Sequence, residues 1–332
     1  MIDKYGRVID YLRISVTDRC NLRCVYCMPE EGVQLIEHNE ILTYDEILRI
    51  CRIFAGLGVS KIKLTGGEPL VRKDLSHLVK DIKSIEGIED VTLTTNGVLL
   101  KEQIKELAEA GIDAVNISLD TLNEEQYACV TRRDKLKDAL EGMYEALKYE
   151  SVRVKVNCVI MPGENENEWI KLAGLSKDNP IDVRFIEMMP IGIGKSNPKG
   201  TQEIVYDKLE TKFGKAKRLQ GSFGNGPAVY VQFKDFVGRT GFISAISHEF
   251  CGDCNRIRLT ADGFLKLCLQ YSNGKDIKAL LRSDMSDEDI ASIIKDTIYN
   301  KPRCHQFVNS DNEGKEEGTG CLEKRRMSSI GG

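Results

Sequence analysis

The chain has 332 residues, a formal net charge of −4 and a sequence pI near 5.8. This acidic balance argues against a general role on nucleic acids or membrane surfaces, which favour a basic surplus. The composition, with 41% hydrophobic and 30% charged residues, is that of an ordinary globular protein. We find no run of roughly 18 apolar residues that could cross a membrane and no apolar signal-peptide core, so we expect a cytoplasmic protein.

Short β-branched runs alternate with segments of helical period through the first 190 residues. We expect strands at residues 11–15, 61–64, 91–94, 114–118, 152–159 and 183–187. We expect helices at residues 44–55, 75–85, 101–110, 136–149 and 167–175. Thr43 and Glu46 have the spacing of a capping box for the first helix, and Gly111 is placed to end the third. The alternation predicts right-handed βαβ units and a parallel sheet.

Six such strands form either a partial barrel or an open sheet, and periodicity alone does not separate these two folds. In both folds, ligands bind at the carboxyl ends of the strands. The loops at residues 17–31, 65–70, 95–99 and 189–194 all follow a strand. We therefore expect these four loops to meet on one rim of the sheet.

The second part of the chain has a different pattern. Residues 191–226 are richer in Gly, Lys and Asn, which is typical of a segment that connects two parts of a chain. Beyond it we expect short antiparallel strands at residues 229–233, 240–244, 256–259 and 264–267, and a helix at 287–299. The polar, Gly-rich end is typical of a flexible tail. We accordingly divide the chain into a core (1–195), a smaller α+β region (196–308) and a tail (309–332).

Cys20, Cys24 and Cys27 form a C-x3-C-x2-C run directly after the first strand. Three thiolates on one short loop can hold three corners of a 4Fe–4S cluster and leave the fourth iron open. The alternative is a zinc site, which would need a fourth ligand, with His38 as the nearest candidate. The chain has eleven cysteines, which we do not expect to form disulfides in a reducing cytosol.

A Gly66-Gly67-Glu68-Pro69 turn follows the second strand. Its glycines allow the backbone to approach a ligand closely, although such a sequence alone is more often an ordinary turn. Together, the cysteine run and this turn resemble the radical S-adenosylmethionine superfamily. The resemblance implies a partial six-stranded parallel (β/α) barrel. It also implies that Tyr26 packs near the adenine of S-adenosylmethionine and that the Gly67 turn meets its methionyl amino group.

A second group, Cys251, Cys254 and Cys268, has C-x2-C-x13-C spacing. Alone it is typical of a zinc ribbon that lacks one ligand. The missing ligand could come from Cys304, Cys321, His248 or His305. However, Arg256 and Arg258 follow on one face of a strand, and guanidinium groups suit phosphate. Two strand arginines are usually a solvated face, but beside three cysteines they indicate a substrate phosphate near a second cluster.

Basic residues also interrupt the core strands at Arg13, Lys63 and Lys155. Buried charges need partners, so each could form an internal ion pair with Asp or Glu. Alternatively, they point into the lumen of a barrel. A basic lumen fits a polyanionic substrate.

The chain ends in Arg325-Arg326-Met327-Ser328-Ser329-Ile330-Gly331-Gly332. Glycines can thread into a narrow pocket where a side chain would clash. This terminus, both cysteine groups and the Asn-Arg-x-Arg sequence after the second group together resemble the GTP 3′,8-cyclase family. That family catalyses the first step of molybdenum cofactor biosynthesis. The resemblance covers residues 6–332, with little signal at 197–225.

The resemblance implies two 4Fe–4S clusters that face each other across the barrel, with S-adenosylmethionine on the first and GTP on the second. The implied contacts to S-adenosylmethionine are Tyr26, Gly67, Ser118 and Met189. The implied contacts to GTP are Arg13, Lys63, Thr94, Lys155, Arg256, Ile257 and Arg258. The residues implied in cyclisation are Gly331, Gly332, Arg256 and Arg258. The implied partners are a flavodoxin- or ferredoxin-like electron donor, a second copy of the chain, and the cyclic pyranopterin monophosphate synthase that acts next.

Two other functions stay open at this point. One is another twin-cluster radical enzyme, such as a peptide or sulfatase maturase, which Cys304 and Cys321 keep possible. The other is a metal-binding regulator without catalysis, although such a protein has no need for the glycine turn or for basic core strands. Cys51 and Cys158 lie in apolar stretches and are expected to be packing residues, whereas the sequence assigns no role to Cys129.

Overall fold

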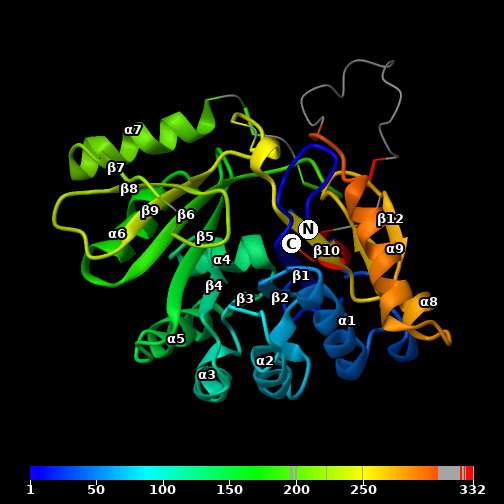
Figure 1. Cartoon of the computed structure of the whole chain (residues 1–332). Coiled ribbons are helices and arrows are strands. Elements are labelled where there is room, and N and C mark those ends of the chain that lie inside the picture. Colours follow the sequence, from blue (N-terminus) through cyan, green and yellow to red (C-terminus); the bar gives the residue numbers. More distant parts are fainter. Residues whose placement is uncertain are drawn as a thin grey trace.

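The six strands predicted for the first part of the chain are all present in the computed structural model, and all are parallel. The structure describes residues 1–332 except 195, 196, 199, 222, 249, 306–321, 324, 326 and 332, and only the backbone of 328 and 329. The strands are β1 (Tyr11–Ser15), β2 (Lys61–Thr65), β3 (Asp90–Thr95), β4 (Ala114–Ser118), β5 (Arg153–Ile160) and β6 (Ile181–Glu187). They follow one another in the sheet and curve into the predicted partial barrel (Figure 1).

The five predicted helices cover the outer face of this sheet (Figure 1). They are α1 (Tyr44–Gly56), α2 (Leu75–Lys83), α3 (Leu100–Glu109), α5 (Leu136–Ala146) and α6 (Trp169–Asp178). The capping box of α1 is confirmed, since the Glu46 N–H donates to Thr43 Oγ1 and the Thr43 N–H donates to the Glu46 carboxylate. A further helix, α4 (Glu124–Thr131), was not predicted because its apolar residues do not recur with a clear helical period.

Strand residues alternate between the helices and the lumen of the barrel, as the pleat of a strand requires. In β1, Leu12 and Ile14 are fully buried in the apolar core, whereas Tyr11 and Arg13 line the lumen. Each fully buried side chain of this size contributes about 1.5–3 kcal/mol. The apolar core therefore lies between sheet and helices, and the lumen is left for polar side chains.

The four strands predicted for the second part form two antiparallel pairs, as expected, and each pair also joins the barrel through a parallel pairing that was not predicted. β9 (Arg239–Ile243) pairs with β6, and β10 (Arg256–Leu259) pairs with β1. The edges of a six-stranded core present unpaired N–H and C=O groups, and these two strands pair with them. The outer strands are antiparallel to their neighbours. They are β8 (Val229–Gln232) and β7 (Lys217–Arg218) beyond β9, and β11 (Phe264–Lys266) and β12 (Gly274–Asp276) beyond β10. Two of them, β7 and β12, were not predicted.

The remaining helices lie in the second part of the chain. They are α7 (Thr201–Phe213), α8 (Lys278–Leu281), α9 (Asp287–Tyr299) and α10 (Met327–Ile330). α9 was predicted with these bounds. α7 was not predicted, because it lies in the stretch that was interpreted as a connecting segment. The division at residues 195 and 308 stays a prediction. Among the described helices, none combines the length and the apolar character needed to cross a membrane.

Candidate active site

A cavity follows the lumen of the barrel and is lined by both groups of cysteines. We call Cys20, Cys24 and Cys27 the first trio, and Cys251, Cys254 and Cys268 the second trio. The other predicted site residues that line this cavity are Arg13, Tyr26, Lys63, Gly67, Thr94, Ser118, Lys155, Met189, Arg256 and Arg258. The side chain of Ile257 does not join them, because it is buried in the apolar core. Any contact of Ile257 with a ligand would therefore come from its backbone.

The first trio lies on the loop that follows the carboxyl end of β1. This loop is held against α4, since the Val25 N–H donates to the Val130 carbonyl (2.9 Å). Burial raises the pKa of Cys20 to about 11, and burial together with the charge of Cys27 raises the pKa of Cys24 well above its ordinary value. These two thiols are therefore protonated at neutral pH, and a bound metal has to displace their protons.

Gly67 packs against the segment that leads into the first trio. Its N–H donates to the Thr17 carbonyl (2.7 Å), and the Glu68 N–H donates to the Arg19 carbonyl (2.7 Å). A Cβ at Gly67 would overlap the carbonyl group of Arg19. Glycine is therefore required here by the close approach of two backbones, a reason that the sequence did not indicate. The contact of this turn with S-adenosylmethionine stays a prediction.

Glu68 is a buried carboxylate that the sequence reasoning did not single out. It accepts hydrogen bonds from Thr95 Oγ1 (2.6 Å), the Asn96 N–H (2.7 Å) and the Leu70 N–H (3.1 Å). Burial raises its pKa to about 7. Glu68 thus ties the turn after β2 to the end of β3 and fixes the rim on which the first trio lies.

Tyr26 and Asp120 form a second, partly buried contact at this rim. The Tyr26 hydroxyl donates to Asp120 Oδ2 (2.7 Å), and the Val159 N–H donates to Asp120 Oδ1 (2.8 Å). Burial raises the pKa of Asp120 to about 6. Tyr26 directly precedes the third cysteine and was predicted as a site residue, whereas Asp120 was not predicted although it lies only two residues after β4.

The second trio lies at the opposite end of the lumen. Cys251 and Cys254 flank a short turn just before β10, and β10 runs parallel to β1. The start of β10 is therefore at the amino-terminal end of the strands. Burial raises the pKa of Cys254, but the charges of Lys301 and Arg256 outweigh it and bring the pKa to about 6. Within the described ranges, no three Cys, His, Asp or Glu side chains converge closely enough for a single metal ion.

Three cations lie side by side between the two trios. Arg258 of β10, Arg13 of β1 and Lys63 of β2 are in register across the sheet, and we call them the cationic row. Burial and the charge of Arg13 lower the pKa of both Lys63 and Arg258 well below the ordinary values. Buried charges of one sign are costly without a counter-charge, so this row is suited to an anion.

Arg184 of β6 lines the same lumen and was missed. Its Nη2 donates to Asn116 Oδ1 (2.5 Å), while its buried Nε has no hydrogen-bond partner in the described structure. An arginine between the buried Val183 and Phe185 is the same signal that selected Lys155. A basic residue that interrupts an apolar core strand therefore also indicates Arg184 in β6.

Lys155 has partners within the protein. Its ammonium lies 3.3 Å from Asp182 Oδ2, and Asp182 also binds Arg239 at 2.7 Å. Burial, followed by the charge of Arg184, lowers the pKa of Lys155 to about 8. The alternative of an internal ion pair is therefore correct for Lys155, although its side chain also lines the cavity.

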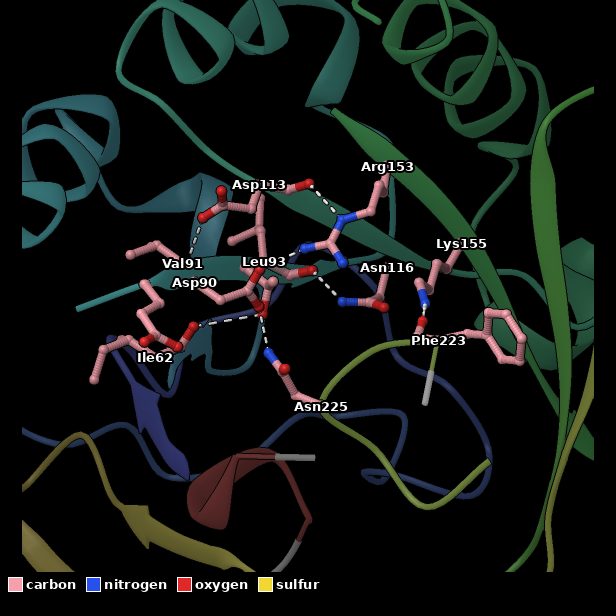
Figure 2. Close-up of polar contacts among 12 residues, drawn as sticks. Ile62, Asp90, Val91, Leu93, Asp113, Asn116, Arg153, Lys155, Phe223 and Asn225 are labelled. Carbon is pink, nitrogen blue, oxygen red and sulfur yellow. Dashed lines mark hydrogen bonds and ion pairs between the residues drawn. The ribbon is translucent and has the colours of Figure 1, made fainter. Parts of the chain in front are cut away.

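The segment 223–227, which we call the floor segment, lies at the amino-terminal end of the lumen (Figure 2). The Phe223 carbonyl accepts a hydrogen bond from Lys155, and the Asn225 side-chain amide donates to Asp90. Asp90 also pairs with Arg153, so one carboxylate joins the starts of β3 and β5 to this segment. Residues 223–225 of the floor segment fall in the stretch with little family signal, and no sequence pattern predicted its position.

The tail reaches the lumen at Gly331, the last residue that the structure describes. The Gly331 carbonyl accepts a hydrogen bond from Arg258, and Ile330 is fully buried beside Ile191. Gly331 has φ +72°, and a Cβ there would lie 3.0 Å from Thr65 Cγ2. The described end of the tail is therefore packed rather than loose, as threading into a narrow pocket requires.

Among the described cysteines outside the two trios, Cys51, Cys129 and Cys158 form no disulfide. Cys51 and Cys158 are fully buried, which confirms the packing role predicted for them. Cys129 is exposed and Cys304 is partly buried. Two residues with predicted or open roles lie outside the described residues, namely Cys321 and Gly332.

Comparison with known families gives two matches along the chain. Residues 14–175 match the model of the Radical SAM superfamily, and residues 181–307 match the model named Molybdenum Cofactor Synthesis C. The chain is 46% identical over 337 residues to the GTP 3′,8-cyclase of Clostridium perfringens (strain 13 / Type A) and 47% identical over 335 residues to that of Pelotomaculum thermopropionicum. Both alignments cover 100% of each protein.

Among solved structures, Streptococcus suis SuiB bound to S-adenosylmethionine is similar to this chain. The TM-score is 0.62 at 15% identity, and the match covers 92% of this chain and 70% of that chain. At this identity the similarity concerns the fold alone.

Proposed function

This chain belongs to the GTP 3′,8-cyclase family of the radical S-adenosylmethionine superfamily, and we propose that GTP is its own substrate. The observation that carries the proposal is a lumen with three thiols at each end and a row of cations between them. The product would be (8S)-3′,8-cyclo-7,8-dihydroguanosine 5′-triphosphate, the first intermediate of molybdenum cofactor biosynthesis.

Each trio fits a 4Fe–4S cluster by the chemistry of its donors. Both consist of thiols alone, three in number, and both face the cavity. Three thiolates leave one iron of such a cluster open to a further molecule. The raised pKa values of Cys20 and Cys24 are consistent with thiols that need a positive partner before they ionise. We propose one cluster on each trio.

S-adenosylmethionine would bind at the carboxyl-terminal rim, beside the first trio. We propose that Tyr26, Gly67, Ser118 and Met189 contact it. The Tyr26–Asp120 and Glu68 contacts hold this rim in place, so the binding surface is formed before the ligand arrives. When bound, the first cluster supplies the electron that splits S-adenosylmethionine into methionine and a 5′-deoxyadenosyl radical.

GTP would lie between the two trios, with its guanine toward the second. We propose that its contacts are Arg13, Lys63, Thr94, Lys155, Arg256, the backbone of Ile257 and Arg258, and we add Arg184 because it lines the same lumen. The cationic row offers buried, charge-assisted hydrogen bonds to a triphosphate. These contacts orient the ribose toward the first trio, from which the radical comes.

In the proposed reaction, the 5′-deoxyadenosyl radical takes the 3′ hydrogen of GTP and becomes 5′-deoxyadenosine. The carbon C3′ of the ribose then bonds to C8 of guanine. One more electron and one proton complete the product. We propose a flavodoxin- or ferredoxin-like carrier as the source of electrons and cyclic pyranopterin monophosphate synthase as the enzyme that acts next. We also propose a homodimer. Within the lumen, Gly331, Gly332, Arg256 and Arg258 would hold the substrate during cyclisation, and the tail and the floor segment would keep water out.

GTP deuterated at C3′ tests the proposal directly. The reconstituted full chain would be incubated under anaerobic conditions with dithionite, S-adenosylmethionine and this GTP. We expect deuterium in 5′-deoxyadenosine and a cyclic nucleotide product in similar amounts. If 5′-deoxyadenosine forms without deuterium and without a cyclic product, GTP is not the substrate. Roughly eight irons per chain support two clusters, whereas one zinc supports the regulator alternative.

A further inference from the structure

Arg7, near the start of the chain, reaches the second trio. Its side chain is 5% exposed and pairs with Asp3 at 2.6 Å. Its Nη1 donates to the carbonyl of Cys251 (2.8 Å), the first ligand candidate of the second trio, and to that of Arg303 (2.8 Å). Its Nη2 donates to the carbonyl of Pro302 (2.7 Å). One guanidinium therefore joins the N-terminal segment, the Cys251 turn and the residues after α9.

Lys301 approaches the other two cysteines of the trio. It is 3% exposed, and its ammonium donates to the carbonyl of Arg256 (2.9 Å) and to that of Leu267. Arg256 lies two residues after Cys254, and Leu267 directly precedes Cys268. Lys301 thus joins the two backbone segments that carry these thiols.

A simpler interpretation is that both cations only satisfy carbonyl groups after the end of α9. Lys301 follows that helix closely, and its own N–H donates to the Ile298 carbonyl. That interpretation does not account for the position of the charge, because Lys301 and all three cysteines of the second trio line the same cavity. The carbonyls of Cys251, Arg256 and Leu267, which these two cations also contact, belong to the segments that carry the trio and do not follow α9.

We propose that Arg7 and Lys301 are positioning residues of the second trio. They hold its three backbone segments at the spacing that a 4Fe–4S cluster needs, and their buried charges compensate the charge of a thiolate-bound cluster. Ligand geometry depends on such outer contacts, and net charge and hydrogen bonds set the potential of an iron–sulfur cluster. This inference rests on the proposed function, because it requires that the second trio binds a cluster.

The experiment uses a full-length parent chain in which Cys20, Cys24 and Cys27 are all changed to Ala, so that bound iron belongs to the second trio. Iron and sulfide per chain are measured after reconstitution, and the midpoint potential is measured by redox titration followed by electron paramagnetic resonance. We expect about four irons in the parent. A parent that binds one zinc, or no iron, contradicts the proposed function and not the positioning role.

Four substitutions in this parent separate position from charge. Lys301→Met removes both the hydrogen bonds and the charge, and we expect it to lose at least half of the iron. Lys301→Gln keeps a donor without the charge, and we expect it to retain iron at a more negative midpoint potential. Arg7→Met should lose iron as Lys301→Met does. Lys278→Met, which removes a cation that pairs with the distant Glu40, should match the parent in both measurements.

Folding is checked in the chain that keeps the first trio. If Lys301→Met still cleaves S-adenosylmethionine there, the barrel is intact and the lost iron reflects the second trio. If Lys301→Met does not cleave S-adenosylmethionine, the iron content and midpoint potential of Lys301→Gln and Arg7→Met test the proposal instead. The proposal is overturned if these variants keep the iron content and the midpoint potential of the parent.

Discussion

The guanidinium of Arg258 donates a hydrogen bond to the carbonyl of Gly331, which lies 73 residues further along the chain. Arg258 is also in register with Arg13, so the tip of the tail lies on the cationic row itself. An anion bound by this row would therefore touch the tail. The relationship explains how the last residues can act in a site built by the first half of the sheet.

Gly331→Ala should separate radical formation from cyclisation. The residue has φ +72°, where a side chain costs about 1–2 kcal/mol, and a Cβ would lie 3.0 Å from Thr65 Cγ2. We expect cyclic product to fall at least about tenfold while 5′-deoxyadenosine still forms. The measurement is the ratio of the two products by liquid chromatography.

Gly174→Ala is the matched control for this glycine substitution. Gly174 lies in α6, and nothing would lie within 4 Å of a Cβ there. We expect normal product and a gain of up to about 1 kcal/mol in stability, since Ala favours a helix over Gly. Equal product ratios in Gly331→Ala and Gly174→Ala would argue against a role for the tail.

Arg184→Gln should weaken binding of the nucleotide. The Arg184 Nε is buried without a partner in the described structure and faces the lumen, where charge-assisted hydrogen bonds are worth about 1.5–3 kcal/mol. We expect KM for GTP to rise roughly 10- to 100-fold with a smaller change in kcat. Arg282→Gln, which breaks a surface pair with Glu46, should leave KM unchanged. A fall in kcat at constant KM would assign Arg184 a different role.

The sequence predicted the barrel well because its signals are local. The β-branched runs of β1 to β6 and the capping box of α1 each specify structure within a few residues. The parallel pairing of β9 with β6 and of β10 with β1 was not predicted, because it depends on distant parts of the chain. Local pattern carries no information about which open edge a strand will join.

In the candidate site, too, residues in local motifs were predicted and residues that act through distant contacts were not. The thiols and the tail are recognisable as motifs, whereas Glu68 and Asp120 act through contacts with residues of other strands. Arg7 contacts the carbonyl of Cys251, 244 residues away, and no spacing rule connects them. Gly67 was selected for a ligand contact, but the structure adds a packing reason in the carbonyl group of Arg19.

Tyr26→Phe should make the stability of the protein more sensitive to pH. The pKa of Asp120 is raised from 3.8 to about 6, so the folded state binds an extra proton between these values and stability falls as pH rises through them. Above about pH 6 this contribution is constant. The Tyr26 hydroxyl favours the ionised form, so its removal raises the pKa of Asp120 further and extends the fall in stability to higher pH.

Urea unfolding of wild type and Tyr26→Phe at pH 5 and pH 8 checks this. We expect a loss of about 0.5–1.5 kcal/mol at pH 5 and about 1.5–3 kcal/mol at pH 8, because the hydrogen bond is charge-assisted only at the higher pH. Tyr144→Phe, at a residue that is 47% exposed, should change little at either pH. A loss that is equal at both pH values, or larger at pH 5, would contradict the assignment of Asp120 as the titrating group.

Asp90→Ala should loosen the floor segment without unfolding the barrel. Asp90 is the carboxylate that binds both Asn225 and Arg153, and Arg153 is 49% exposed, so the ion pair itself contributes little stability (Figure 2). We expect amide hydrogen exchange in 223–227 to speed up at least about tenfold, and 5′-deoxyadenosine to form in excess over cyclic product as water enters the lumen.

Asp113→Ala is the control on the same end of the sheet. Asp113 accepts from the Val91 N–H (2.6 Å) and pairs with Lys83 (2.9 Å), and Figure 2 draws no contact between Asp113 and the floor segment. We expect exchange in 223–227 and the product ratio to stay at the wild-type values. If Asp90→Ala and Asp113→Ala alter exchange there equally, Asp90 does not hold the floor segment. If exchange rises only in Asp90→Ala but the product ratio does not change, the floor segment is a structural closure and the tail alone excludes water.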